Sequence, residues 1–240
     1  MKNSAFTALL ALCLAAPVFA QSPAMPPPSR AQGAAVVPIE VELRRLHAAA
    51  RQGDAEAENT LGMMYLEGQG VERDPAQAAA WFRQAAEQGH AAGQYNLGLM
   101  YLKGQGVARN DAHAMAWLLK AAQQENDQAQ YLLGVQYQEG RGVAKSDAQA
   151  AAWYRKAAGQ GHATAQHALG RMYEYGWGVP RDETQAVFWY RKAAEQGDPL
   201  AQKNLGRMYY EGHGVPKDCA RAVFWLKKSN SVKFIPTCPS

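Results

Sequence analysis

The pattern Gly-x-Gly-Val returns along this chain at a fixed interval of 36 residues, beginning at Gly68. Its further copies begin at Gly104, Gly140, Gly176 and Gly212. Leu-Gly-x-x-Tyr precedes each copy, and a tryptophan follows each copy at a constant distance. A fixed period of this size is typical of a stacked array, in which no unit can bury its apolar face without a neighbour. The sequence therefore predicts five repeats instead of one globular core.

Each unit has the pattern of two helices, here called helix A and helix B, joined by a turn. In the first unit, helical spacing relates the apolar residues Ala57, Leu61, Met64 and Tyr65. Gly68 suits the left-handed residue that ends helix A. Asp74 and Pro75 suit the first positions of helix B. The expected buried stripe of helix B consists of Ala78, Trp81, Phe82, Ala85 and Ala86.

The repeated pattern is L-G-x-x-Y-x-x-G-x-G-V-x-x-D-x-x-x-A-x-x-W-x-x-x-A-A-x-x-G, over residues 54–233. It resembles the Sel-one-like repeat family, which is related to the tetratricopeptide repeats. The resemblance implies an all-α, right-handed α-solenoid of five helix-turn-helix repeats, with helix A lining the concave side. It also implies a protein-interaction scaffold or adaptor in preference to an enzyme.

Residues 1–20 have the composition of a secretory signal peptide. Lys2 precedes an apolar run from Ala5 to Phe19, and small residues end the segment. We therefore expect export, to the periplasm in preference to the medium, and no membrane insertion after the signal is removed. Residues 21–38 are rich in proline and alanine, which favours a flexible linker.

The remaining chain divides by the repeat register. We expect a capping helix at 39–53, repeats at 54–89, 90–125, 126–161, 162–197 and 198–233, and a tail at 234–240. The capping helix has the register of a lone helix B. Where the other turns between repeats have glycine, the second has Glu125. Either Asn126 takes the left-handed conformation there, or helix B continues through it.

The sequence predicts no catalytic, cofactor or metal site. Its histidines lack the spacing of metal ligands, and its Gly-x-Gly turns lie between helices instead of following a strand as phosphate loops do. Removal of the signal peptide leaves 24 basic and 21 acidic residues, which does not favour a nucleic-acid partner. We expect a monomer that binds a protein or peptide.

Two alternative functions remain open. Cysteine-rich members of the family bind or hydrolyse β-lactams, but they staple each repeat with a cysteine pair, and these repeats are nearly free of cysteine. A purely structural spacer in an envelope assembly is the second alternative. Removal of the signal leaves Cys219 and Cys238, and an even count in an oxidising compartment predicts a disulfide between them that holds the tail over the last repeat.

The predicted binding groove consists of the helix A positions that point away from the core, together with the fourth turn. Its residues are Asn59, Met63, Leu66, Tyr95, Leu99, Tyr131, Val135, His167, Arg171, Lys203, Arg207, Tyr175 and Trp177. The first three repeats offer an apolar floor and the last two offer basic groups. Such a groove fits a segment with apolar anchors at one end and acidic groups at the other.

An alternative assigns these residues to packing. Neighbouring A helices then cover Met63, Leu99 and Val135, while Arg171 and Arg207 are solvated or paired with glutamates.

Overall fold

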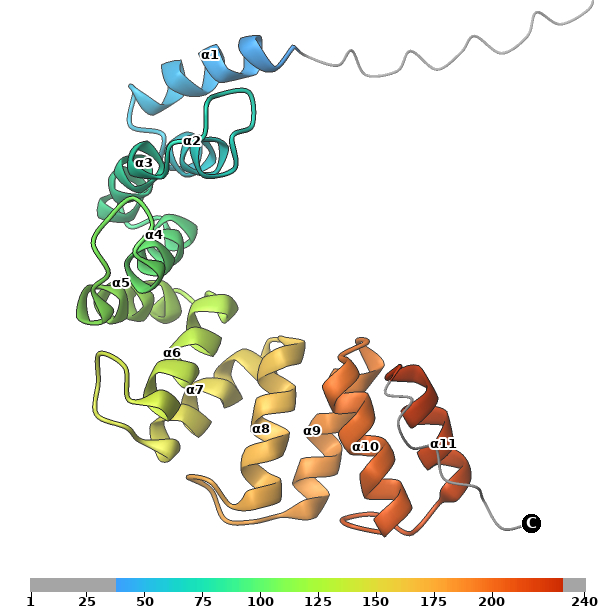
Figure 1. Ribbon diagram of the computed structural model, residues 1–240. Helices are drawn as coiled ribbons and strands as arrows, with labels where there is room; N and C mark the ends of the chain where they lie inside the picture. Colours follow the sequence, from blue (N-terminus) through green and yellow to red (C-terminus); the bar gives the residue numbers. More distant parts are fainter. Residues whose placement is uncertain (1–37, 231–240) are drawn as a thin grey trace, which may run out of the picture. The chain divides into compact units, whose positions relative to one another are not determined.

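The computed structural model describes residues 38–230, which form eleven α-helices and no strand (Figure 1). The helices are α1 Ile39–Ala50, α2 Ala55–Glu67, α3 Pro75–Glu87, α4 Ala91–Lys103, α5 Asp111–Gln123, α6 Asp127–Glu139, α7 Asp147–Gly159, α8 Ala163–Tyr175, α9 Glu183–Glu195, α10 Pro199–Glu211 and α11 Cys219–Lys228. Each packs mainly on the helices before and after it, which is the contact pattern of an α-solenoid. The even-numbered helices are the A helices, and α1 stands alone as a helix B. In this part of the chain, none of the helices has the length and apolar character needed to cross a bilayer.

Capping side chains define where the helices begin. Asp74 accepts hydrogen bonds from the backbone N–H groups of Ala76 and Gln77, and a side chain caps every helix from α2 to α11. Each such cap stabilises its helix by about 1 kcal/mol. Each A helix ends at a left-handed glycine, such as Gly68 with φ 77°. The predicted caps and glycine ends are therefore confirmed.

Both expectations for the second turn between repeats are wrong. Glu125 itself takes the left-handed conformation, with φ 63°, at the position where the preceding turn has Gly89. Asn126 instead caps α6, and its Oδ1 accepts the N–H of Ala129 at 2.8 Å. Because the helix needs the Asn126 oxygen as its cap, the chain reversal falls on the residue before it, although glutamate lacks the conformational freedom of glycine.

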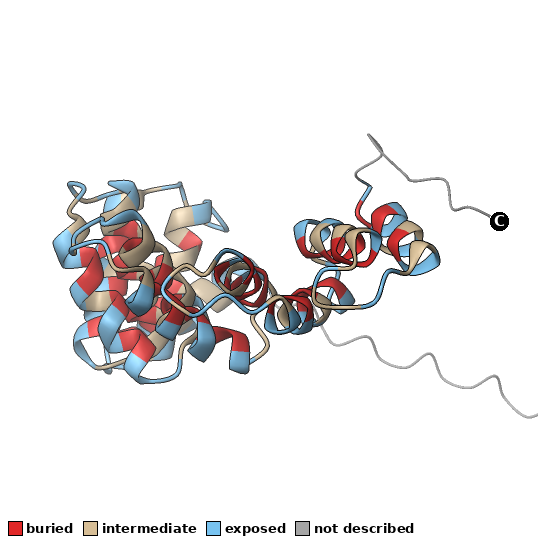
Figure 2. Ribbon diagram, turned by 90° about the horizontal axis from the view of Figure 1, so that it is seen from below, coloured by how far each residue is buried: buried red, intermediate tan, exposed pale blue. Residues whose placement is uncertain are grey.

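The core of each repeat is one large side chain of helix B set against a glycine of helix A. These fully or nearly fully buried side chains are Phe82, Leu118, Tyr154, Tyr190 and Leu226. A Cβ added to Gly134 would lie 2.5 Å from the ring of Tyr154, and the same contact recurs in the other repeats. Trp81 and its repeat equivalents are only partly buried, which corrects their assignment to the buried stripe. Figure 2 shows the buried residues along the facing sides of neighbouring helices.

The second glycine of each turn joins one repeat to the previous helix B. A Cβ on Gly106 would lie 1.9 Å from the carbonyl oxygen of Pro75, in the first turn of α3. Gly142, Gly178 and Gly214 make the same approach to α5, α7 and α9. Gly70 lies at the corresponding place on α1, but there an added Cβ would meet the side chain of Ile39, 2.4 Å from its Cγ1, instead of the backbone. Helix α1 therefore occupies the helix B position ahead of the first repeat.

Hydrogen-bonded glutamines also connect the repeats, each link joining a buried glutamine of helix A to an exposed one at the end of helix B. The Nε2 of Gln94 donates to the carbonyl oxygen of Ala86 at the end of α3, at 3.2 Å. The Oε1 of Gln94 accepts from the Nε2 of Gln124, at 2.9 Å. Later repeats repeat both bonds through Gln130, Gln160, Gln166 and Gln196, and Gln202 repeats the first. Each buried amide N–H thus finds an acceptor in a helix-end carbonyl, which also accepts a backbone N–H from the following turn.

The first repeat departs from this pattern because Glu58 stands at the glutamine position. Its Oε2 accepts from the Nε2 of Gln88 at 2.6 Å. The residue is 3% exposed. Burial raises the pKa of Glu58, and the nearby Asp54 raises it further, against the opposite effects of Gln88 and His90. The carbonyl oxygen of Ala50 corresponds to that of Ala86, to which Gln94 donates in the next repeat. When Glu58 is ionised it cannot donate the equivalent hydrogen bond to Ala50.

We predict that Gly134→Ala destabilises the protein by about 1–3 kcal/mol, because the new methyl group would overlap the ring of Tyr154. The matched control is Gly159→Ala in α7, where an added Cβ meets nothing within 4 Å. That change should be neutral, or stabilising by up to about 1 kcal/mol, because alanine favours helix. Urea unfolding followed by circular dichroism compares the two, and equal effects would contradict the knob-and-glycine packing.

We also predict that Glu58→Gln stabilises the protein at pH 7 by about 1 kcal/mol, the scale of one buried hydrogen bond. The folded-state pKa of Glu58 lies above its ordinary value of 4.5. The cost of ionising Glu58 is therefore absent below that value and grows as the pH rises through the raised pKa. Thermal unfolding from pH 4 to pH 8 should show an advantage of the variant that fades on acidification. An advantage that is independent of pH would exclude the carboxylate as its cause.

Candidate functional site

The apolar half of the predicted groove contributes to packing between repeats. Asn59 is 9% exposed, and its Oδ1 accepts from the Nδ2 of Asn96 on the next A helix at 2.9 Å. The other residues of this half are partly buried: Met63, Leu66, Tyr95, Leu99, Tyr131 and Val135. All of these except Leu99 pack against the buried clusters of the array. This half therefore presents only parts of its side chains to solvent.

His167 is buried in the fourth repeat instead of lying open on the surface. It is 7% exposed, and its Nε2 lies 3.1 Å from the Nδ2 of Asn204 on the next A helix. The Nδ2 of Asn204 can only donate a hydrogen bond, so the Nε2 of His167 is the acceptor. Burial lowers the pKa of His167, which is consistent with a neutral ring. The bond repeats the Asn59–Asn96 link between neighbouring A helices.

Arg207 is held in a network that spans two repeats. Its Nη2 donates to Oε1 of Glu174, and its Nη1 donates to Oε2 of Glu211 at 2.8 Å. The other oxygen of Glu174 accepts from the hydroxyl of Tyr190 at 2.6 Å, and burial raises the pKa of that hydroxyl. Arg207 is therefore paired, as the packing alternative has it.

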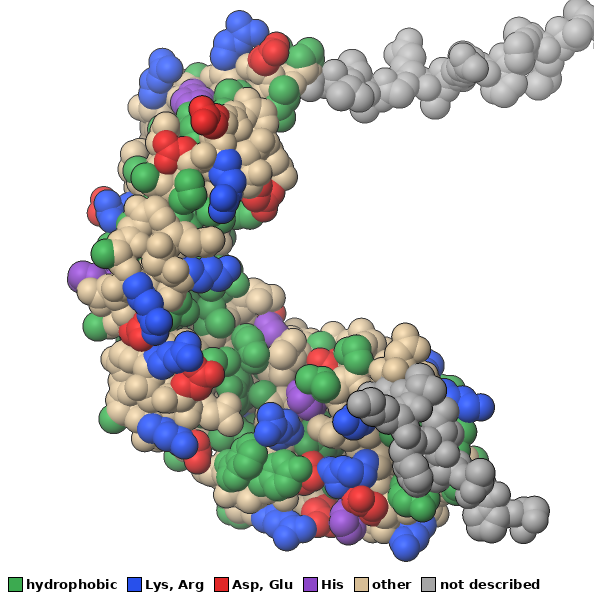
Figure 3. Space-filling model, in the orientation of Figure 1, with side chains coloured by type: hydrophobic (Ala, Val, Ile, Leu, Met, Phe, Trp, Pro, Cys, Tyr) green, Lys and Arg blue, Asp and Glu red, His purple; other side chains and the backbone are tan. Residues whose placement is uncertain are grey.

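The fourth turn presents an aromatic and cationic patch, defined by the exposed Arg171 and Tyr175 and the half-buried Trp177. The Tyr175 and Trp177 rings stack with centroids 4.8 Å apart, and the Arg171 guanidinium lies 5.2 Å from the Trp177 ring centroid. Tyr175 is 52% exposed. Hydrophobic side chains gather beside Lys and Arg over the end of α8 (Figure 3). Lys203 on α10 is also exposed.

A pocket of about 290 Å³ adjoins this patch. Its lining residues are Glu174, Tyr175, Arg181, Glu183, Arg207 and His213. Arg181 pairs with Glu183, and His213 Nδ1 lies 3.2 Å from Oε2 of Glu211. The charged side chains that line this pocket are thus largely paired with one another. A partner would therefore contact the patch mainly through its aromatic side chains.

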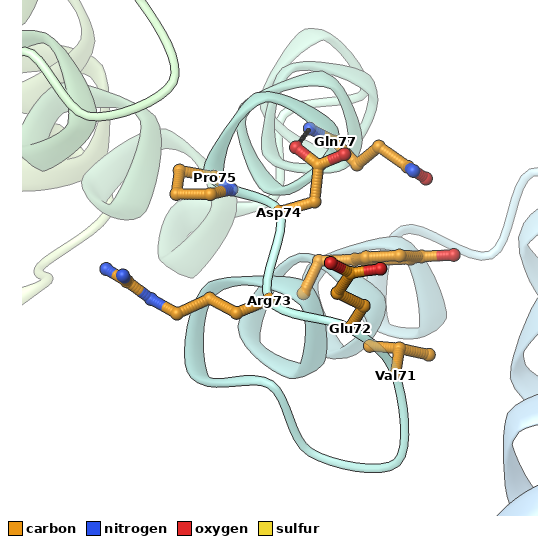
Figure 4. Close-up of a pocket in the computed structure, with 7 residues that line it drawn as sticks. Val71, Glu72, Arg73, Asp74, Pro75 and Gln77 are labelled. Carbon is orange, nitrogen blue, oxygen red and sulfur yellow. Dashed lines mark hydrogen bonds between the residues drawn. The ribbon is translucent and has the colours of Figure 1, made fainter.

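A second pocket lies at the first turn (Figure 4). Its lining residues are Tyr65, Val71, Glu72, Arg73, Asp74, Pro75 and Gln77. The Asp74 carboxylate faces the start of α3, where the N–H of Gln77 lowers its pKa. Arg73 points away from Glu72 and Asp74 (Figure 4). No nucleophile and base converge in this pocket.

Histidines cap two of the A helices. The Nδ1 atoms of His90 and His162 accept the N–H groups of Gly93 and Ala165, at 3.1 and 3.2 Å. Across residues 38–230, no group of three or more His, Cys, Asp or Glu side chains could hold a metal ion. Cys238 lies outside the described residues, so its bond with Cys219 stays a prediction.

The family model for the Sel1 repeat matches residues 55–90, 91–126, 127–162, 163–198 and 199–231. The chain belongs to the Sel1 repeat family. Members of this family generally act as protein-interaction scaffolds and are typically not enzymes.

Solved structures with the same fold include three bacterial proteins. A Sel1 repeat protein of Oxalobacter formigenes is 38% identical, with a TM-score of 0.75, and the match covers 82% of this chain and 81% of that one. A protective antigen of uropathogenic Escherichia coli with an SLR fold is 40% identical, with a TM-score of 0.77 over 79% of this chain, which spans only 40% of the antigen's length. An immunity protein of Pseudomonas aeruginosa is 25% identical, with a TM-score of 0.52 over 84% of this chain and 77% of that one. No curated protein matched the sequence.

We predict that the two arginines of the basic half respond differently to charge reversal. Arg207→Glu would bring a third carboxylate to Glu174 and Glu211 and should cost about 2–4 kcal/mol. Arg171→Glu loses a surface contact with Trp177 and should cost no more than about 1 kcal/mol. Thermal unfolding of the two single variants measures the difference. Equal losses of stability would mean that the Arg207 network adds nothing to the fold.

Proposed function

We propose that this Sel1 repeat protein is an exported adaptor, which binds a segment of a protein partner along the exposed side of its A helices. The patch of Arg171, Tyr175 and Trp177 is the centre of that contact. The observation that carries the proposal is the stacking of the exposed Tyr175 ring on the half-buried Trp177 ring, beside the exposed Arg171 cation.

The fourth turn differs from the other four at two positions, those of Tyr175 and Trp177, where the repeat pattern does not fix the residue type. The Trp177 position holds Gln69, Gln105, Arg141 or His213 in the other repeats, and the Tyr175 position holds Glu67, Lys103, Glu139 or Glu211. Those residues support the same turn, so the turn backbone requires neither ring, although the Trp177 ring packs in part against the core of the array. Aromatic and arginine side chains are the most common hot spots of protein interfaces.

The charges around the patch indicate the chemistry of the partner. Arg171 and Lys203 are exposed cations of the A helices. The partly exposed side chains of Tyr95, Leu99 and Val135 continue the same side of the array with apolar character. A segment with apolar side chains and an acidic end would match both.

Export to the periplasm is the second part of the proposal. Lys2, the apolar run from Ala5 to Phe19 and the small residues that follow it support a signal peptide. The proline-rich stretch at 21–38 would then separate the array from the cleavage site.

The test replaces the patch with residues that the array already uses at these positions. Tyr175→Glu with Trp177→Gln gives the fourth turn the side chains of the first turn, so the fold should be retained. The control, Glu139→Gln with Arg141→Gln, changes the same two positions in the third turn. Tagged wild-type and variant proteins are incubated with an envelope extract of the source organism, and the captured proteins are quantified by mass spectrometry.

We expect the wild type and the control to recover the same dominant partner. The patch variant should bind it about 30-fold more weakly, the effect of losing a hot spot. Equal recovery by the folded patch variant would refute the assignment of this site.

A further inference from the structure

The charge of the array is divided between its two ends. Residues 54–125 contain 5 basic and 9 acidic side chains, whereas residues 126–230 contain 14 basic and 10 acidic ones. The small net charge of the whole chain conceals this asymmetry.

The basic side chains of the later repeats are concentrated on the B helices. Beyond their first turns, α7, α9 and α11 carry six cations and one acid, Glu195. The cations are Arg155, Lys156, Arg191, Lys192, Lys227 and Lys228. Lys156, Lys192 and Lys228 are exposed and lie one repeat apart. No acid forms an ion pair with these three lysines among the described residues.

Two phenylalanines lie on the same exposed side of α9 and α11. Phe188 is 43% exposed and Phe224 is 50% exposed, although this position holds alanine in the first three repeats, at Ala80, Ala116 and Ala152. The Lys192 and Lys228 ammonium groups lie 5.2 and 5.0 Å from the centroids of these rings. Each of the last two repeats therefore exposes an aromatic ring and an ammonium group together.

We propose that this surface, made by Phe188, Lys192, Phe224 and Lys228, binds peripherally to an anionic lipid membrane. The phenyl rings would enter the interfacial region, while the two lysines, with the exposed Lys227, contact lipid phosphates. The occupant follows from charge complementarity, because a lysine ammonium group lies over each of the two exposed rings and Lys227 adds a third exposed cation. Phenylalanine beside lysine is the composition of surfaces that lie in the interfacial region of a bilayer.

This surface lies on different helices from the patch of Arg171, Tyr175 and Trp177. A membrane on α9 and α11 would therefore leave the A-helix patch uncovered. The inference does not depend on the proposed function, because neither surface contributes a residue to the other.

The test is co-sedimentation of the mature protein with vesicles of phosphatidylcholine, alone or with phosphatidylglycerol at a 7:3 ratio, where ~30% anionic lipid gives a strongly negative surface. Phe188→Ala with Phe224→Ala restores the alanine of the first three repeats, and Lys192→Gln with Lys228→Gln restores Gln84 of the first repeat. The matched control removes two exposed lysines elsewhere, by Lys103→Gln with Lys145→Gln. Circular dichroism verifies that all variants are folded.

We expect binding to the anionic vesicles only, with loss at high salt. The lysine variant should bind about 30-fold more weakly, from two lost surface cations, and the phenylalanine variant about tenfold more weakly. The control should bind within about threefold of the wild type, since its lysines lie outside the proposed surface.

Absence of binding to anionic vesicles would overturn the proposal, as would binding that the two surface variants leave unchanged. Sedimentation velocity without lipid tests the alternative that a second copy of the chain binds to this surface. A dimer that high salt and the phenylalanine variant both dissolve would assign this surface to self-association instead.

Discussion

The fold depends on one steric constraint, which is that the helix A glycine leaves room for a large side chain of helix B and for nothing else. At Gly170 an added Cβ would lie 2.7 Å from the ring of Tyr190, and at Gly206 it would lie 2.7 Å from Leu226. The large residue varies among phenylalanine, leucine and tyrosine, while the glycine does not vary. The spacing between the two helix backbones is thus fixed by the lack of a side chain at the helix A glycine. The helix B side chain that fills the space can change with its surroundings.

The type of the large helix B residue matches the helix A residue that it contacts. Tyr154 and Tyr190 carry hydroxyl groups, and each donates to a polar residue of its own helix A, Gln138 or Glu174. Phe82 has no hydroxyl group, and the corresponding helix A position holds Leu66. A buried hydroxyl without an acceptor would be costly, so the two positions match. Polar chemistry enters the later repeats without altering how the helices pack.

The helices, their caps and the turns other than the one at Glu125 could be predicted, because they follow from patterns along one repeat. The side-chain partners could not, because they join residues of different repeats. Trp81 and Phe82 are neighbours on one apolar stripe, and only the position of helix A decides which is fully buried. Arg207 has the register of Arg171, but its partner Glu174 lies in the preceding repeat. The recurring glutamines, Gln94 and its equivalents, were a periodic signal that could have indicated the buried links between repeats.

The pairing of Arg207 bears on what the A-helix side can recognise. Glu174 is shared between Tyr190 and Arg207, so a ligand carboxylate that approached Arg207 would have to compete with an intramolecular charge that is already in place. Among residues 38–230 Arg171 forms no ion pair, and its guanidinium lies over the Trp177 ring. An acidic group bound there would also lie beside the exposed Tyr175 ring. Charge and apolar contact therefore coincide at the fourth repeat, where the turn departs from the repeat pattern.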